Sequence, residues 1–405
     1  MPKGTKHHIL YTNTSIDKPQ EEIWELIQGY TNENFPDDIP ETYYRTDFIV
    51  LLPPLKYENK FVKGLYMTQG VECIQAQYPE HKKLFMPMEY SMWSSLPWAQ
   101  SADIYLTSYK NQAREDWFRQ KYPDKADKIL IPLQDADFTH EYAIAPYTNY
   151  NKDIDVIYIA RLDEVKNLPL FTRALRIYEE KYGYTLKVVL VTGTQKDDYG
   201  EKQMEIVRQM AEEAGGYEEL KKYITFLGEV EYGKELCIYF SRSKCAVLTS
   251  IFEGKNRMLN EAMCCNVPVV VFKDLCKYTR GESEIFPENA GIYIEEFSAE
   301  ALADGLHRMM KTYRKFTPRR SYLQNGGRIK FLNKCIDSIP YYRENLPEYE
   351  PGRIQENLWV DLAMQANYRL GLHDYIYGVR LDIQHGRFEG KKLPALEFYQ
   401  RHFNI

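Results

Sequence analysis

The strongest constraint on the fold is a regular alternation of short apolar runs with stretches of helical length between residues 153 and 314. Such alternation is typical of parallel strands joined by crossover helices. A sheet of this kind is covered by helices on both faces, and its ligands bind beyond the carboxyl ends of its strands. The expected strands are Ile154–Ala160, Thr185–Thr192, Tyr223–Leu227, Cys245–Thr249, Val267–Phe272 and Gly291–Ile294, and the expected helices are Leu168–Tyr182, Lys202–Ala214, Lys234–Arg242, Arg257–Cys265 and Ala299–Tyr313.

A weaker alternation of the same kind covers the N-terminal part of the chain, and residues 135–152, which lack periodicity, are expected to link the two halves. The sequence therefore predicts an α/β protein with an N-terminal Rossmann-like domain at 1–145 and a C-terminal one at 146–315. A helical C-terminal extension at 316–405 would pack across the domains. The N-terminal candidate strands, expected to be parallel, are His8–Thr12, Asp47–Leu52, Gly64–Thr68, Lys83–Pro87, Asp103–Thr107 and Lys128–Pro132, and the further candidate helices are Tyr109–Lys121 and Gln355–Leu370.

Composition and charge exclude several classes of protein. The 405 residues are 44% apolar and 27% charged, and no apolar run approaches the roughly 20 residues of a membrane span. Met1–His8 lack the apolar core of a signal peptide, so we expect a cytoplasmic protein. A net charge of −6 argues against nucleic acid as a partner. The seven cysteines form no Cys-x-x-Cys pair and are expected to be reduced thiols, not zinc ligands.

One candidate site lies in the segment Ser250–Met263, between two expected strands. Glu253 falls in the loop, and Glu261, eight residues later, falls in the helix that follows. Gly254 would let the backbone come close to a ligand. The first helical turn leaves N–H groups without internal partners, and these suit an anionic phosphate. The alternative is an ordinary strand-to-helix turn with solvated acids.

A second candidate site lies at the carboxyl end of the expected strand Ile154–Ala160. Arg161 follows this strand directly, and Lys166 comes five residues later. An arginine fork and a lysine point charge can bind the same diphosphate. Surface charge is the alternative when this pair is considered alone. The position of Arg161 and Lys166 upstream of the loop with two glutamates favours one common site for both motifs.

Taken in order, these motifs resemble the retaining GT-B glycosyltransferases of family four (glycosyl transferases group 1). The resemblance covers about 160 residues and says little about the first 140 or so. It implies two Rossmann-like doubly wound domains that face a central cleft. The matching residues are Ala160-Arg161-Leu162 with Lys166, Ser250, Glu253-Gly254, Glu261-Ala262-Met263 and Pro268-Val269-Val270.

The resemblance also implies roles for single residues. Arg161 and Lys166 would hold the nucleotide diphosphate, and Glu253 would contact the donor sugar. Glu261 would bind the ribose hydroxyls, and the base would lie against Val230, after Phe226-Leu227-Gly228. Backbone amides near Arg257, Met258 and Leu259 would meet the β-phosphate. The expected catalytic residues are Arg161, Lys166 and Glu253, and the expected donor-binding residues are Arg161, Lys166, Thr192, Gly193, Val230, Gly254, Arg257, Met258, Leu259 and Glu261.

The chain departs from the family pattern at three places. Lys255-Asn256-Arg257 replaces a glycine-rich run, and Thr12–Asp17 stands where many members have a glycine-rich loop. A histidine that often lines the acceptor side is not evident. Asn13 and Glu89 are therefore the candidate acceptor residues, with a capping or surface acid as the alternative for Glu89.

The sequence thus predicts a metal-independent glycosyltransferase that uses no cofactor, and the resemblance implies that it retains the anomeric configuration. It would move a hexose from a nucleotide sugar, UDP-glucose by default, to a saccharide, lipid-linked or other hydroxyl acceptor, as in polysaccharide biosynthesis. Neither Asp135-Ala136-Asp137, in the linker, nor Asp153-Ile154-Asp155, at the amino end of a strand, is interpreted as a metal site. The alternatives are a nucleotide-sugar epimerase or phosphorylase and a non-catalytic sugar-nucleotide-binding protein on the same fold. The basic segment Lys56–Lys63 is a candidate for contact with the inner face of the membrane. The alternative is that this segment is a solvated loop.

Overall fold

The computed structural model falls into two compact units. Unit 1 contains the described residues of 139–328, and unit 2 contains those of 42–138 and 329–401. The expected strand His8–Thr12, most of the helix Tyr109–Lys121 and the helix Gln355–Leu370 lie outside the described residues. The structure describes residues 42–57, 60–68, 70–90, 101–107, 115–116, 119–120, 123–125, 127–139, 141, 143–195, 198–276, 284–346, 349–353, 374–382, 387–389, 396–397 and 400–401.

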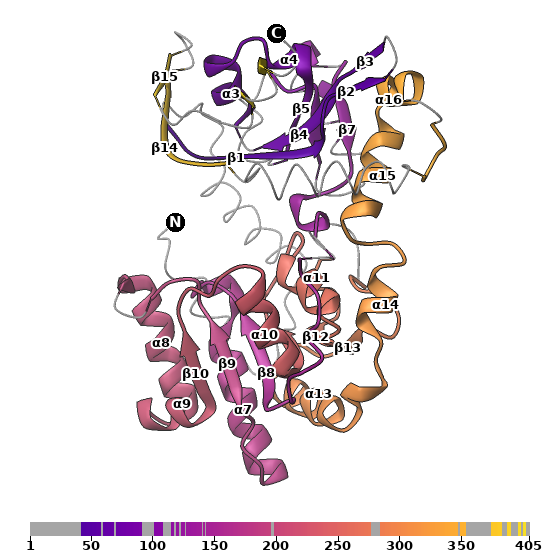
Figure 1. Ribbon diagram of the computed structural model, residues 1–405. Coiled ribbons are helices and arrows are strands. Elements are labelled where there is room, and N and C mark those ends of the chain that lie inside the picture. The colour runs from indigo at the N-terminus through magenta and orange to yellow at the C-terminus, as the bar shows by residue number, and fades with distance from the viewer. Residues whose placement is uncertain are drawn as a thin grey trace. The chain divides into compact units, whose positions relative to one another are not determined.

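Unit 1 is built around a six-stranded parallel sheet with the strand order β10-β9-β8-β11-β12-β13 (Figure 1). Every strand that the sequence predicted here is confirmed, with ends that differ by a few residues. The strands are β8 (Ile154–Ile159), β9 (Val188–Val191), β10 (Ile224–Leu227), β11 (Ser243–Leu248), β12 (Val269–Phe272) and β13 (Gly291–Ile294).

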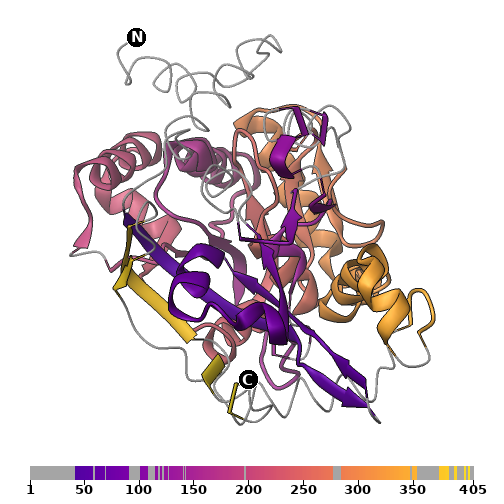
Figure 2. The same cartoon turned by 90° about the horizontal axis from the view of Figure 1, so that it is seen from above.

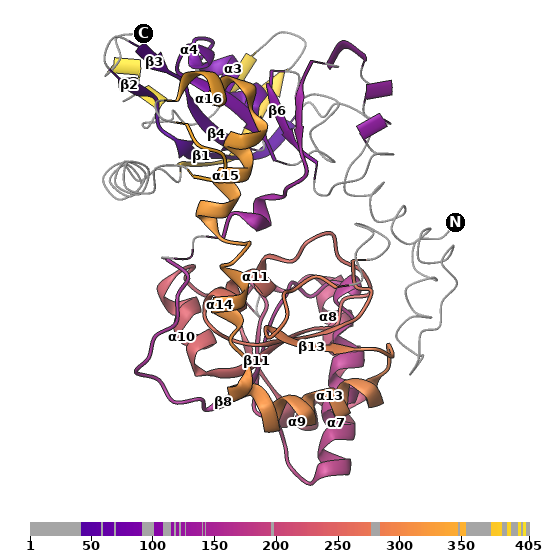
Figure 3. The same ribbon diagram turned by 90° about the vertical axis from the view of Figure 1, so that its right-hand side faces the viewer.

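The helices of unit 1 also agree with the sequence prediction, apart from one that was missed. The missed helix, α9, follows α8 after Gly215 and Gly216, whose φ angles of 93° and 135° end one helix and redirect the chain into the next. α7 packs against both α8 and α13, and α13 lies beside β13 (Figure 3). The helices are α7 (Leu168–Tyr182), α8 (Glu201–Ala214), α9 (Tyr217–Tyr223), α10 (Lys234–Arg242), α11 (Arg257–Cys264) and α13 (Ala299–Thr312).

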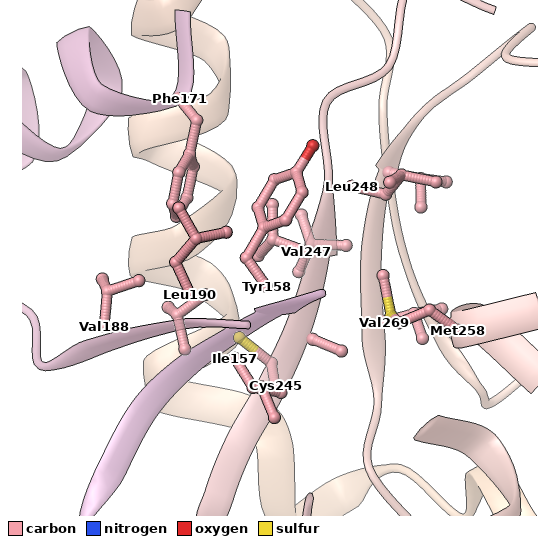
Figure 4. Packing of buried hydrophobic residues seen from close by; sticks show 14 of the residues in the cluster. Ile157, Tyr158, Phe171, Val188, Leu190, Cys245, Val247, Leu248, Met258 and Val269 are labelled. Atoms are coloured by element: carbon pink, nitrogen blue, oxygen red, sulfur yellow. The ribbon is translucent and has the colours of Figure 1, made fainter. Parts of the chain in front are cut away.

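The core of unit 1 lies between this sheet and its helices. The inner strands β8, β9, β11 and β12 are mostly buried on both faces, so they are mainly apolar runs and not alternating ones. The aromatic ring of Tyr158, in the central strand β8, packs beside Phe171 of α7 with ring centroids 5.1 Å apart (Figure 4). Val247 and Leu190 surround the same ring.

Unit 2 contains a seven-stranded mixed sheet with the order β15-β14-β1-β4-β5-β6-β7. β4 to β7 are parallel, as the sequence predicted, but β1 is antiparallel to β4. The expectation of a parallel strand was wrong for β1, because the connection to β4 is too short for a crossover helix. The strands are β1 (Thr42–Leu52), β4 (Gly64–Thr68), β5 (Phe85–Glu89), β6 (Ile104–Leu106), β7 (Ile129–Ile131), β14 (Asp374–Asp382) and β15 (Arg387–Glu389), and the short helices are α3 (Val71–Gln77) and α4 (His81–Leu84).

The basic segment Lys56–Lys63 belongs to the connection between β1 and β4. It forms two short antiparallel strands, β2 (Leu55–Tyr57) and β3 (Lys60–Val62). The backbone N–H of Lys63 donates to the Tyr341 hydroxyl at 2.9 Å, and Lys60 Nζ donates to the Glu344 carbonyl at 3.3 Å. These two contacts hold the segment against α16 (Pro340–Asn345), while Lys56 and Lys60 are exposed, and contact with a membrane stays a prediction.

The C-terminal segment is helical only in its first part. α14 (Pro318–Tyr322), α15 (Arg328–Ser338) and α16 (Pro340–Asn345) agree with the expected helical extension. Further on, the extension contributes two strands, β14 and β15, and β14 pairs antiparallel with β1 (Figure 2). The helical expectation was wrong there, because Asp374–Asp382 is rich in aromatic and β-branched residues (Tyr375, Ile376, Tyr377 and Val379), which favour strands. The division of the chain at 145 and 315 into domains stays a prediction.

Arg319, in α14, ties the segment after α13 to the rest of unit 1. Its guanidinium donates to the carbonyls of Cys264 (2.5 Å), Glu141 (2.8 Å) and Ile144 (3.3 Å). We expect Arg319→Ala to lower the stability of unit 1 by about 2 to 4 kcal/mol, because it leaves carbonyls without their charged partner. The neighbouring variant Arg320→Ala, at an exposed position, is the control and should unfold like the wild type. Thermal unfolding of both variants tests this, and equal midpoints would contradict it.

Two further features of the described residues bear on the sequence predictions. No helix among them is long and apolar enough to cross a bilayer. The cysteines whose side chains are described are buried free thiols: Cys237, Cys245, Cys264, Cys265, Cys276 and Cys335.

Candidate functional site

The topology of unit 1 places both sequence motifs at one point of the sheet. The chain adds β9 and β10 on one side of β8, then crosses over and adds β11, β12 and β13 on the other side. The strand order therefore reverses between β8 and β11, and ligands of such sheets bind beyond the carboxyl ends at this reversal. Arg161 and Lys166 follow β8, and Glu253 and Glu261 follow β11.

The turn after β8 has a defined local structure. The Asp163 carboxylate accepts a hydrogen bond from the backbone of Val165 at 2.9 Å and so caps a short 3₁₀ helix, Glu164–Lys166. Asn167 ends this helix in the left-handed region, with φ of 50°, which asparagine tolerates better than most residues. The turn presents Lys166 at the edge of the sheet.

Lys166 and Glu253 meet at the centre of the candidate site. Lys166 Nζ donates to Glu253 Oε1, and the two side chains are only 14% and 10% exposed. A backbone hydrogen bond of 2.8 Å from Ile251 to the Val165 carbonyl joins the two loops that carry them. A buried pair of this kind has little competition from water, so each charge acts strongly on whatever binds beside it.

The loop after β11 also holds Glu253 through neutral side chains. Ser250 Oγ donates to Glu253 Oε1 at 2.7 Å, and Asn256 Nδ2 donates to the same oxygen at 3.2 Å. Asn256 caps α11 as well, because its Oδ1 accepts from the backbone of Met258 at 3.0 Å. Asn256 thus links the amino end of α11 to the carboxylate, and it already satisfies one of the amides expected to meet a phosphate.

Glu261, on α11, is a buried carboxylate with an unused acceptor. The residue is 5% exposed, and its Oε1 has no hydrogen-bond partner. Burial raises the pKa of Glu261 to about 7, although Arg257 and the Tyr232 hydroxyl oppose this rise. A buried acceptor without a partner is costly for the folded protein unless a ligand supplies a hydrogen-bond donor.

The structure does not bring Arg161 to the Lys166–Glu253 pair. Its side chain is 71% exposed, and its guanidinium lies 3.7 Å from the Asp163 carboxylate. The flexible side chain projects from the same edge of the sheet as Lys166, so it can reach a ligand bound there only by leaving Asp163.

The other expected donor-binding residues lie after the carboxyl ends of neighbouring strands. The Thr192 hydroxyl, after β9, is buried and bonded to the Thr194 and Leu227 carbonyls, at 2.8 and 3.1 Å, which joins the ends of β9 and β10. Gly193 is exposed with φ of 72°, and Val230 packs partly against the core. Of the remaining residues, Met258 and Leu259 are buried, Gly254 is half-buried and Arg257 is exposed.

The two candidate acceptor residues are Asn13 and Glu89. Asn13 lies outside the described residues. Glu89, at the end of β5 in unit 2, is buried, and its Oε2 accepts from the backbone of Val71 at the start of α3, at 3.2 Å. This contact caps α3, as in the alternative interpretation of Glu89, and an acceptor role for the residue stays a prediction.

Sequence reasoning missed three residues that act on this site. Tyr158 and Thr249 form hydrogen bonds to the turn that carries Lys166, and Tyr232 faces Glu261. The available signal was a hydroxyl-bearing aromatic residue inside the mainly apolar strand Ile154–Ile159. A strand-end threonine and a loop tyrosine carry no comparable signal.

The acidic tripeptides are both engaged in protein contacts. Asp153 pairs with Arg242, with Oδ2 to Nη2 at 2.7 Å, and Asp155 pairs with Lys244 at 2.5 Å. Asp137 accepts from the backbone of Gln134 at 2.9 Å. Among the described residues, no cluster of three or more His, Cys, Asp or Glu side chains could hold a metal ion.

Comparison with known proteins agrees with this fold. Residues 141–329, slightly less than half of the chain, match the family model of the glycosyl transferases group 1. Together with the two α/β units, this match defines the class of protein, and the chain is a glycosyltransferase with a glycosyl transferases group 1 domain. The predicted α/β class of the GT-B type is confirmed, with a parallel sheet in unit 1 and a mixed sheet in unit 2. No curated protein matches the chain.

Several solved structures are similar to the chain at low identity. Sucrose-phosphate synthase from Thermosynechococcus elongatus is 17% identical, with 76% of this chain and 67% of that chain covered and a TM-score of 0.42. A glycosyltransferase from Rickettsia africae is 14% identical, with coverages of 69% and 82% and a TM-score of 0.47. The pneumococcal O-GlcNAc transferase GtfA is 14% identical, with 62% of this chain and 46% of that chain covered and a TM-score of 0.43. At identities and TM-scores this low, the similarities indicate no particular donor or acceptor.

Proposed function

We propose that this glycosyltransferase moves a hexose from a nucleotide sugar to a hydroxyl acceptor, with retention of the anomeric configuration and without a metal ion. The observation that carries the proposal is the meeting of Lys166 and Glu253 where the strand order reverses. One positive charge and one carboxylate, held together in a mostly buried place, suit a ligand that has a diphosphate beside a sugar.

Lys166 would stabilise the leaving diphosphate. The bond between the anomeric carbon and the phosphate oxygen breaks, and negative charge grows on the diphosphate as it departs. Lys166, Arg161 turned from Asp163, and the amino end of α11 would supply the compensating positive charge. These groups support metal independence by offering charge that a metal ion would otherwise supply.

Glu253 would orient the transferred sugar. Three groups already hold its Oε1 in place, so the carboxylate is fixed before the sugar arrives. A fixed acceptor loses little freedom when it binds a sugar hydroxyl, and this favours the reacting geometry.

Glu261 would bind the ribose of the nucleotide. Its buried Oε1 lacks a partner, and a ribose hydroxyl would supply the missing hydrogen bond. The base would lie near Val230, in the loop after β10. UDP-glucose is our default donor, a saccharide or lipid-linked hydroxyl is the acceptor, and a cytoplasmic location at the inner face of the membrane remains part of the proposal.

Thermal unfolding with a panel of nucleotide sugars tests this function. At a concentration 100 times its dissociation constant, the correct donor should stabilise the protein by about 2.7 kcal/mol, and the others should not. Slow hydrolysis of this donor, unchanged by EDTA, is the expected second result. Its measurement by nuclear magnetic resonance also gives the anomeric configuration of the first-formed sugar.

The same experiment separates the alternatives. Conversion of the nucleotide sugar into an isomer, with no acceptor present, would indicate an epimerase and overturn the proposal. Binding without any turnover would indicate a sugar-nucleotide-binding protein. If EDTA abolishes turnover and Mg²⁺ restores it, only the metal-independent part of the proposal is overturned.

A further inference from the structure

We propose that Tyr158 and Thr249 are positioning residues for Lys166, which they fix by binding the backbone of its turn. This inference rests on the proposed function of Lys166 at the diphosphate. It adds two residues, one from β8 and one from the segment after β11, that touch no substrate themselves.

The hydrogen bonds converge on one backbone carbonyl. The Tyr158 hydroxyl donates to the Lys166 carbonyl at 2.9 Å, and Thr249 Oγ1 lies 2.9 Å from the same oxygen. The two hydroxyls lie 3.0 Å apart, and the Tyr158 oxygen also accepts from the Thr249 backbone N–H at 3.0 Å. Thr249 Oγ1 lies 3.3 Å from the Asn167 carbonyl as well.

This network is buried. Tyr158 and Thr249 are both 0% exposed, and in Figure 4 the Tyr158 hydroxyl points away from the aliphatic side chains around its ring. Burial raises the pKa of Tyr158, so the hydroxyl remains protonated and can donate. A satisfied polar network in a low-dielectric core is rigid, because breaking any bond leaves a buried polar group without a partner.

The side chain of Asn167 does not contribute to holding this turn. It is 0% exposed, and neither its Nδ2 nor its Oδ1 has a hydrogen-bond partner. The αL conformation of Asn167 is uncommon for a residue other than glycine, so the turn needs outside contacts to stay in place. Tyr158 and Thr249 provide such contacts.

The network also joins the two halves of the site. Thr249 precedes Ser250, which donates to Glu253, and Tyr158 lies in the strand that leads to Lys166. A shift of the Lys166 carbonyl would therefore move Lys166 Nζ relative to Glu253. Misplacement of a catalytic group by about 1 Å can lower a rate by up to about a hundredfold.

Four variants of the full chain test the proposal. The first readout is turnover of the nucleotide sugar that the thermal-unfolding panel selects. The second is affinity for the corresponding nucleoside diphosphate (UDP, GDP or ADP). We expect Tyr158→Phe and Thr249→Val each to lower kcat by roughly tenfold, with KM for the acceptor unchanged. Thr249→Ser keeps the hydroxyl and should restore most of the activity. Tyr223→Phe is the matched control, because Tyr223 is a buried tyrosine of the same unit whose hydroxyl donates to Glu179 at 2.7 Å. It should cost similar stability and leave kcat unchanged.

A double-mutant cycle with Lys166→Ala separates positioning from general damage. If the network acts through Lys166, adding Tyr158→Phe to Lys166→Ala should weaken nucleoside diphosphate binding no further. Equal weakening in both backgrounds would overturn the proposal. If Tyr158→Phe and Thr249→Val keep the wild-type kcat and affinity while Lys166→Ala is defective, the positioning proposal is overturned and the proposed function stands. A silent Lys166→Ala would overturn both.

Discussion

Lys166→Ala is expected to lower turnover of the nucleotide sugar by about a hundredfold to a thousandfold, the loss typical of removing one group that stabilises developing negative charge. The effect should appear mainly in kcat, because the charge on the diphosphate grows as the glycosidic bond breaks. Glu253→Gln keeps the shape of the side chain but removes its charge, so it should lower turnover as well. Single-turnover kinetics with saturating donor measure both losses directly.

The control for Lys166→Ala must break an ion pair of similar burial elsewhere. Arg173 and Glu213 join α7 to α8, with side chains 15% and 18% exposed and Nη2 to Oε1 at 2.5 Å. Arg173→Ala leaves a mostly buried carboxylate without its partner, as Lys166→Ala does, so both should lower the unfolding midpoint. Only Lys166→Ala should lower turnover by about a hundredfold or more. Near-native turnover in folded Lys166→Ala, or equal losses in the two variants, would contradict the role of Lys166.

The strands of unit 1 could be predicted from the sequence because each contains a short, mainly apolar run between stretches of helical length. Those runs arise because parallel strands covered on both faces must be apolar throughout. Unit 2 was harder to predict. The pairing of β1 with β14 joins residues more than 300 positions apart, as in Thr42 with Arg380, and no local pattern encodes such a pairing. The helix α9, only seven residues long and separated from α8 by two glycines, was not predicted.

The site was predictable in part, for a physical reason. Residues that follow the carboxyl ends of parallel strands meet at one edge of the sheet, so Lys166 and Glu253 could be placed together from sequence order alone. The groups that hold Lys166 and Glu253 in place could not be predicted in this way. The bonds from Tyr158 and Thr249 to the Lys166 carbonyl depend on the exact approach of two strands, and the position of Arg161 beside Asp163 depends on rotamers.

Glu261→Gln should stabilise the protein without ligand at pH 8 and weaken its binding of the nucleotide. Burial raises the pKa of Glu261 from 4.5 to about 7, so the folded protein keeps this proton where the unfolded chain has lost it. Stability therefore falls as the pH rises from about 4.5 to about 7, and the full cost applies above pH 7. At about 1.4 kcal/mol per pKa unit, the charge costs about 3 kcal/mol there. The groups that share this environment are Arg257 on α11, Tyr232 before α10, and Cys237 within α10.

Glutamine removes this charge but buries a new amide, which needs a hydrogen-bond partner and reduces the gain to about 1 to 2 kcal/mol. The gain should nearly vanish at pH 4.5, where Glu261 is protonated in the folded state and about half-protonated in the unfolded chain, so urea unfolding at pH 4.5 and pH 8 is the decisive comparison. Glu218→Gln is the control, because the Glu218 side chain on α9 is 85% exposed. It should change stability little at either pH.

The same substitution should weaken binding of the nucleoside diphosphate by about tenfold to a hundredfold, because a hydrogen bond to a charged group contributes about 1.5 to 3 kcal/mol. Calorimetric titration at pH 8 measures this loss. A gain in stability together with a loss of affinity would mean that the fold retains a destabilising buried carboxylate for the sake of the ligand. If Glu261→Gln binds the nucleoside diphosphate as tightly as the wild type, Glu261 does not bind the ribose, whatever its effect on stability.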